Sequence, residues 1–150
     1  MSEMKINQPT DKAIIIGEEV FEIDPTDFSI DTSDIDIELC NMAQLLMSYG
    51  HVEARAKIAM EKADADMDFV QAICYNEAKE SAEGKVTVDQ LRNSALIDQR
   101  YQDAVAYSNF TIEQHARARW AVVALQAKAE CLKVIGYRDN RMYKAERYVD

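Results

Sequence analysis

The sequence predicts an all-α protein, built as a long antiparallel helical hairpin with a short elbow helix and a short C-terminal helix. Both prolines of the 150-residue chain, Pro9 and Pro25, lie within its first 25 residues, so no proline interrupts a helix after that point. Apolar residues then recur at helical spacing over two long stretches. We therefore expect an N-terminal acidic arm over residues 1–33 and a helical domain over residues 34–150.

The N-terminal arm contains two short apolar runs, Ile14–Ile16 and Val20–Ile23, on either side of Gly17. This pattern predicts a small β-hairpin, and an extended acidic arm is the alternative. A lone hairpin is marginal in water, so it must pack on another part of the chain or on a neighbouring subunit. Residues 24–27 are expected to form a turn, and the acidic segment that follows, up to Asp34, is expected to be extended.

The first long helix is predicted to begin near Ser33, with Asp36 completing a weak capping box. It should end between Ser81 and Lys85. Steps of three and four define an apolar line in which ten of twelve residues are apolar, as in a coiled coil. That line is Leu39, Met42, Leu46, Tyr49, Glu53, Ala56, Met60, Ala63, Met67, Val70, Cys74 and Glu77.

Thr87 and Gln90 form a capping box that predicts the short elbow helix, and Asp98 should cap the second long helix. Gly136 is expected to end that helix, since glycine is common just after a helix C-terminus. The short C-terminal helix would follow from Asp139. The predicted apolar line of the second long helix is Tyr101, Val105, Ile112, Ala116, Trp120, Val123, Ala127, Cys131 and Val134, with Ser108 as its polar member.

A hairpin of two helices cannot cover apolar stripes this wide. We therefore expect a homo-oligomer in which copies of the chain cover the remaining surface.

No motif in the sequence points to catalysis or to a cofactor. His51 and His115 lie far from the cysteines in sequence, and the run from Asp64 to Asp68 lacks the glycine and glutamate of a calcium loop. We expect no enzyme, no metal and no cofactor. Three scattered cysteines and the lack of a signal peptide or long apolar run indicate a cytoplasmic protein without a membrane contact.

Charge is distributed unevenly along the chain, whose formal net charge is −10. Residues 1–40 hold two lysines and eleven acidic residues, a net of −9, whereas residues 105–150 hold eight basic and five acidic residues, a net of +3. This asymmetry is typical of polyanion binding or of an acidic arm that shields a basic site. Solvated helix faces are the simpler explanation.

The chain ends in KVIGYRDNRMYKAERYVD, which combines bases with tyrosines. Single-stranded nucleic acid binding needs cations for the backbone and flat groups for stacking. Trp120 lies on the predicted apolar line and fits the core better, and Arg117 can pair with Glu113. The tyrosines can equally pack on a partner helix. The candidate nucleic-acid-binding residues of this third are Arg117, Arg119, Lys128, Lys133, Tyr137, Arg138, Arg141, Tyr143, Lys144 and Arg147.

The order of elements, together with four segments, resembles the UvsY-like recombination mediators of tailed phages. The segments are IIGEEVFEIDP, YGHVEARAKIAMEKADADMD, EAKESAEGKVTVDQLRNSALIDQRYQDAV and ALQAKAECLKVIGYRDNRMYKAE. The resemblance implies a ring-like helical oligomer that binds single-stranded DNA and helps to load a RecA-type recombinase onto strands covered by a single-strand-binding protein. It implies the host cell cytoplasm if the protein is phage-encoded. It also points to a second group of binding residues, Arg55, Lys57, Lys62, Lys79 and Lys85.

Two other functions fit the composition. The chain can be a non-enzymatic helical protein–protein adaptor whose basic tail docks an acidic partner. It can also be an acidic DNA mimic that inhibits a nuclease or repressor, which agrees with the net charge of −10 but not with the basic last third.

Overall fold

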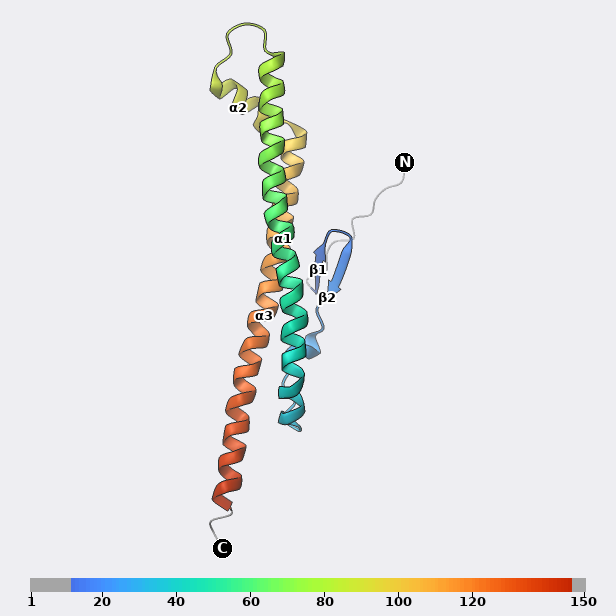
Figure 1. The fold of residues 1–150 in the computed structure, drawn as a ribbon, viewed down its shortest axis with the longest axis vertical. Helices are drawn as coiled ribbons and strands as arrows, with labels where there is room; N and C mark the ends of the chain where they lie inside the picture. The colour runs from blue at the N-terminus through green and yellow to red at the C-terminus, as the bar shows by residue number, and fades with distance from the viewer. Residues whose placement is uncertain (1–11, 147–150) are drawn as a thin grey trace. The chain divides into compact units, whose positions relative to one another are not determined.

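The computed structural model describes residues 12–146, and side chains for residues 12–140 (Figure 1). It is mostly helical. The elements in chain order are β1 (Ala13–Ile16), β2 (Glu19–Glu22), the 3-10 turn η1 (Pro25–Phe28), α1 (Ile35–Ser81), α2 (Val88–Ile97) and α3 (Gln99–Glu146). They form two compact units. Unit 1 comprises Met1–Glu53 and Arg117–Asp150, and unit 2 comprises Ala54–Ala116.

The predicted β-hairpin is present in unit 1. β1 and β2 pair antiparallel, with Ala13 opposite Glu22 and Ile16 opposite Glu19. Gly17 is the first turn residue and has a φ of +62°, which a two-residue hairpin turn requires there and which glycine adopts most easily. Ile14 is only 1% exposed, so β1 contributes a core residue to the unit.

The acidic segment after β2 begins with the predicted turn, which is η1, and packs on α1 through Asp27 and Phe28. The carboxylate of Asp24 accepts hydrogen bonds from the hydroxyl and backbone N–H of Thr26, which lower the pKa of Asp24. From α1, the Tyr49 hydroxyl donates to Asp27 Oδ2 over 2.7 Å, and the Tyr49 ring meets Phe28 edge to face. Burial, followed by this hydrogen bond, raises the pKa of Tyr49 to about 12.

The start of α1 lies one residue later than predicted. Asp34 Oδ1 accepts a hydrogen bond from the backbone N–H of Ile37 over 3.0 Å, so Asp34 is the residue that caps the helix. Ser33 instead donates both its hydroxyl and its backbone N–H to Asp31 Oδ1. These two hydrogen bonds lower the pKa of Asp31.

Unit 1 has a core of large apolar side chains. Met42 of α1 and Leu125 and Leu132 of α3 are fully buried. Around them pack the partly buried residues Phe28, Ile35, Leu39, Leu45, Leu46, Tyr49 and Ala129. The core therefore joins the N-terminal segment, the first part of α1 and the last part of α3.

Unit 2 buries small and polar side chains instead. Those of α1 are Ala56, Ala63 and Cys74, and those of α3 are Ser108, Thr111 and Gln114. The Thr111 hydroxyl donates to the backbone carbonyl of Ser108 within α3. From α2, Leu91 and Ala95 complete the set. Met42, Ala56, Ala63 and Cys74 are all buried members of the predicted α1 line, which is confirmed there.

The predicted elbow helix is α2. Thr87 accepts from the backbone N–H of Gln90, and the Gln90 side chain accepts from the backbone N–H of Thr87, which completes the predicted capping box. Asp98 Oδ1 accepts from the backbone N–H of Arg100 at the start of α3, as predicted. The predicted break at Gly136 is wrong, because α3 continues to Glu146 without a separate C-terminal helix.

The predicted apolar line of α3 is also wrong over most of its length. Ile112, Trp120, Val123 and Val134 are between 43% and 72% exposed. In unit 1 the buried face of α3 is instead Ala118, Ala121, Leu125, Lys128 and Leu132. At 100° per residue these positions lie almost opposite the predicted line. α3 thus has two apolar faces, and the more apolar one points away from the core.

Candidate nucleic-acid interface

The C-terminal end of α3 extends past the start of α1 (Figure 1). Gly136 lies beside the first residue of α1, since a Cβ added to Gly136 would be 3.8 Å from Ile35 Cγ2. The next two residues are exposed, Tyr137 to 72%. No described side chain pairs with Arg138. This helix end therefore presents an aromatic ring and a cation beyond α1.

The remaining tail candidates continue this helix end. Arg141, Tyr143 and Lys144 belong to α3, but their side chains lie outside the described part. Positions 137, 141 and 144 recur at steps of four and three, so they share one side of the helix. Arg147 lies beyond the described residues.

Lys128 is buried in unit 1. Its ammonium group donates to Glu38 Oε2 over 2.7 Å and to the backbone carbonyl of Asp27 over 2.9 Å, and its side chain is 5% exposed. A buried charge requires such partners because desolvation is costly. Lys128 thus connects α3 to both α1 and η1, and its charge is not presented to a ligand in this fold.

Other basic residues of α3 are also engaged. Arg117 donates from Nη1 to the backbone carbonyl of Ala13, which holds β1 on the helix. Lys133 forms an ion pair of 2.7 Å with Glu130, which raises the pKa of Lys133. Arg119 lies 3.9 Å from a Glu53 oxygen but remains mostly exposed. Lys133 and Arg119 can exchange these solvent-exposed partners for a phosphate at little cost.

The second group of candidates is confined to unit 2. Lys57 lies 3.9 Å from Glu61, and Arg55 is half-buried. Lys62, Lys79 and Lys85 are exposed and form no ion pair with a described residue. These cations share their unit with eleven acidic residues and a net charge of −4, counted over residues 54–116. The unit therefore offers isolated cations rather than a basic surface.

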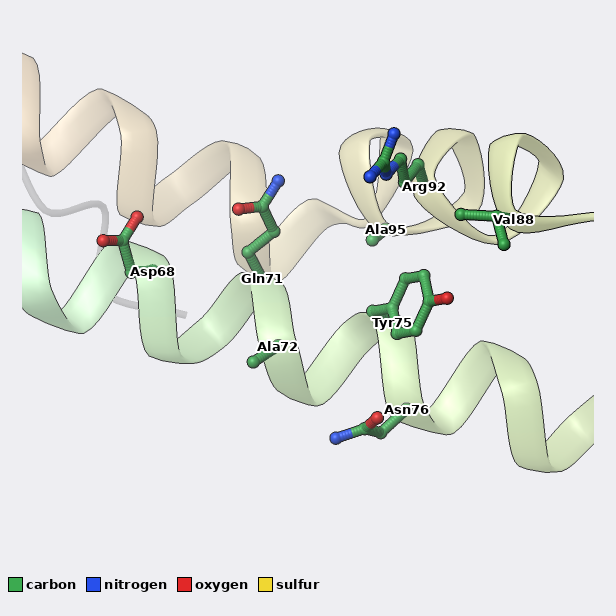
Figure 2. A pocket seen from close by; sticks show the side chains of 8 residues that line it. All are labelled: Asp68, Gln71, Ala72, Tyr75, Asn76, Val88, Arg92 and Ala95. Carbon is green, nitrogen blue, oxygen red and sulfur yellow. The ribbon is translucent and has the colours of Figure 1, made fainter.

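Unit 2 also contains a notch between α1 and α2, with a volume of about 370 Å³ (Figure 2). Arg92 and Val88 of α2 face Gln71 and Tyr75 of α1 across it. Neither Arg92 nor Tyr75 was a predicted site residue, and no sequence motif marks them. The notch is open, and ligand pockets generally bury most of their ligand, so we assign no ligand to it.

A cluster at the start of α3 holds the end of unit 2 together. Arg100 donates to Glu77 of α1 and to Asp98, with Nη2 2.9 Å from Asp98 Oδ2. Hydrogen bonds from Arg100 lower the pKa of Asp98 to about 2 and also lower the pKa of Glu77. Burial raises the pKa of the neighbouring Cys74 thiol. The cluster is thus a structural ion-pair network.

Within residues 12–146, no three His, Cys, Asp or Glu side chains gather in a way that would hold a metal ion. None of the described helices combines the length and the apolar character needed to cross a membrane.

Comparison with protein-family models, with curated proteins and with solved structures finds no match to this chain.

Proposed function

We propose that the protein is a recombination mediator that binds single-stranded DNA as a homo-oligomer. In this role it would assist the loading of a RecA-type recombinase onto strands covered by a single-strand-binding protein. One observation carries the DNA-binding part of the proposal. The basic and aromatic end of α3, residues 137–146, extends beyond the start of α1, where Tyr137 and Arg138 are exposed.

The chemistry of this helix end suits a flexible single strand. Aromatic rings stack on bases of any sequence, and cations neutralise phosphates. One copy offers a modest charge, since residues 137–147 hold four basic and two acidic residues. An oligomer repeats the surface, and the simultaneous contacts of one strand with several copies add avidity.

The role of the acidic N-terminal segment is part of the proposal. Residues of this segment already engage two cations of α3, because Ala13 accepts from Arg117 and Asp27 accepts from Lys128. Asp34 and Asp36 line a shallow hollow with Asp139 and Asn140 of α3. These carboxylates oppose phosphates near the helix end, so the segment weakens DNA binding and makes it selective.

The test is fluorescence anisotropy with a labelled single-stranded oligonucleotide and a matched duplex. We expect preferential binding of the single strand, with an affinity that falls steeply as salt is raised. The triple variant Arg138→Ala, Arg141→Ala, Lys144→Ala should weaken binding by about tenfold or more, because it removes cations that contact phosphates. A wild-type protein that binds no single strand even at low salt would reject the DNA-binding function.

The matched control is the triple variant Lys62→Ala, Lys79→Ala, Lys85→Ala, which removes the same charge from exposed positions of unit 2. It should retain most of the affinity. If both triple variants lose affinity equally, net charge rather than the helix end determines binding.

The adaptor function remains a second candidate, and the exposed apolar face of α3 favours it. Trp120 and Val134 are 72% and 52% exposed, and apolar faces of this kind generally meet another protein. An oligomer that binds no DNA at low salt would support the adaptor.

A further inference from the structure

Unit 1 has an exposed apolar face on α3 and an exposed face on α1 in which apolar residues alternate with polar ones. The face on α3 consists of Trp120, Val123, Ala127, Cys131 and Val134, and the face on α1 consists of Ile37, Cys40, Gln44, Met47 and His51. Members of each face recur at steps of three and four, as in a coiled-coil seam. Met47 and Trp120 are each 72% exposed.

Each face lies opposite the side of its helix that packs in the core. On α1 the core side contains Met42 and Leu46, about 160° around the helix from the centre of the exposed face at 100° per residue. On α3 the core side contains Leu125 and Leu132, at a similar angle from Trp120 and Val134. The two faces therefore lie on opposite sides of unit 1.

The contacts within unit 1 show which residues of α1 and α3 lie at the same level. Arg119 lies beside Glu53, and Gly136 lies beside Ile35. The residue numbers in these pairs add up to 172 and 171. Those of Lys128 and Glu38, whose long side chains form an ion pair, add up to 166. Because the helices are antiparallel here, a sum near 171 gives the level of the other residues of unit 1 to within about one and a half turns.

We infer that the exposed α3 face of one copy packs against the exposed α1 face of the next copy. If the next copy is related by a rotation about an axis parallel to the helices, its α1 lies at the same level along that axis as the α1 of the first copy. The relation then pairs Trp120 with His51, Ala127 with Gln44 and Val134 with Ile37 of the neighbouring copy. It also pairs Cys131 with Cys40. Both stripes thus coincide in one register along about four helical turns.

The charges of the two helices favour this unlike pairing. Residues 35–53 of α1 contain three acidic residues and no Lys or Arg, whereas residues 117–140 of α3 contain five basic and two acidic residues. Pairing two α3 faces would instead bring together exposed Arg119, Lys133 and Arg138 from both copies. Like charges at an interface oppose association.

Because the α1 face and the α3 face lie on opposite sides of unit 1, each copy can bind one neighbour through each face. This is a heterologous interface, and it repeats from copy to copy. It closes into a ring if the rotation allows, and otherwise gives a filament. The contact supplies the interface for the self-association that the proposed function includes, but it does not depend on DNA binding. In such an assembly the α3 ends beyond Gly136 all lie on one rim, which leaves them free for other contacts.

The two exposed cysteines provide the test. The full-length protein, without DNA, is oxidised with copper phenanthroline and run on a non-reducing denaturing gel. We expect a ladder of covalent multimers, because each copy forms one bond through Cys131 and another through Cys40. Cys40→Ser and Cys131→Ser should each abolish the ladder, and mixing these two variants should give a single dimer band.

Buried Cys74 provides the matched control, since Cys74→Ala should leave the ladder unchanged. A variant with only Cys40 or only Cys131 exposed that crosslinks to itself as efficiently as the wild type would overturn the inference, because it would show like faces in contact. A wild-type oligomer by light scattering that forms no Cys40–Cys131 bond would also overturn it. So would a monomer at micromolar concentration.

A second variant pair tests the contact without cysteine chemistry. Val134→Glu should reduce the mass measured by light scattering while circular dichroism stays unchanged. Ile97→Glu, at an exposed apolar position of unit 2, should leave the mass unchanged. Loss of the crosslinks with intact DNA binding in the anisotropy assay rejects this interface alone. Intact crosslinks without DNA binding reject the proposed function alone.

Discussion

Unit 1 and unit 2 contain parts of the same two helices but fill their interiors differently. In unit 1 the fully buried side chains include Ile14, Leu125 and Leu132, and an N-terminal hairpin and turn cover the helices. In unit 2 most buried residues of α1 and α3 are alanine, serine or threonine. Unit 1 thus depends on the burial of large apolar side chains, whereas the interior of unit 2 consists mostly of short side chains.

The two units should therefore respond differently to substitutions of their buried residues. A large buried side chain leaves a cavity when it is shortened, and a small one clashes when it is enlarged. Substitutions of each kind, paired with exposed controls, can therefore confirm or refute the contrast.

The largest effect is expected for Leu125→Ala in unit 1. Leu125 is completely buried, so the variant should lower the free energy of unfolding by about 2–5 kcal/mol. The measurement is denaturant unfolding followed by circular dichroism, which reports the loss of helix. The exposed neighbour Gln126→Ala should change stability by less than about 0.5 kcal/mol. Equal effects of the two substitutions would contradict the assigned core.

Enlarging a small residue of unit 2 should have the next largest effect. Ala63 is 2% exposed, and Ala63→Leu should destabilise the protein by about 1–3 kcal/mol through overpacking. Ala65→Leu adds the same side chain at an exposed position of the same helix and should be nearly neutral. Thermal unfolding followed by circular dichroism measures both. If Ala63→Leu is neutral or stabilising, unit 2 has more internal space than its short side chains indicate.

The smallest effect concerns the N-terminal hairpin and turn, which cover the helices of unit 1. Tyr49→Phe removes the hydrogen bond to Asp27 and should cost about 1 kcal/mol at neutral pH. The pKa of Tyr49 is raised to about 12, so the fold favours the neutral phenol. Its stabilisation is fully present below pH 10, the ordinary tyrosine pKa, and is lost as the pH rises from about 10 to 12.

The measurement is the denaturation midpoint of wild type and Tyr49→Phe at pH 9 and pH 11. Other tyrosines and lysines titrate in both proteins, so the difference between the two midpoints is informative. That difference should shrink at the higher pH. No difference at either pH would mean that Tyr49 stabilises unit 1 through ring packing on Phe28 alone, because phenylalanine keeps the ring. A constant non-zero difference would contradict the raised pKa of Tyr49.

The sequence predicted the helical elements well because their signals are local. The Thr87–Gln90 capping box and the buried positions of α1 follow from residues within one or two turns. For α3 the helical spacing was right and the predicted member Ser108 is buried, but from Ile112 onward the predicted line lies on the exposed face. In unit 1 the outer face of this helix, with Trp120 and Val123, is more apolar than an inner face that contains Lys128.

The candidate site was predictable only in part, for the same physical reason. The exposed positions of Tyr137 and Arg138 agree with a tail suited to ligand contact. The burial of Lys128 depends on Glu38 and on the carbonyl of Asp27, which lie 90 or more residues earlier in the chain. Periodicity within α3 contains no information about such partners. The role of Gly136 likewise depends on Ile35, beside which the helix passes without a break.

The two opposite faces of α3 also limit which insertions and deletions the helix can tolerate. Inserting or deleting one residue between Ala118 and Leu132 would rotate all later positions by about 100°, which would remove Leu132 from the core and Val134 from the outer face at once. A change of seven residues rotates the helix by only about 20° and moves it by about 10 Å. Homologous chains should therefore vary freely in residue type along the solvated sides of α3, while differing in its length by steps of seven.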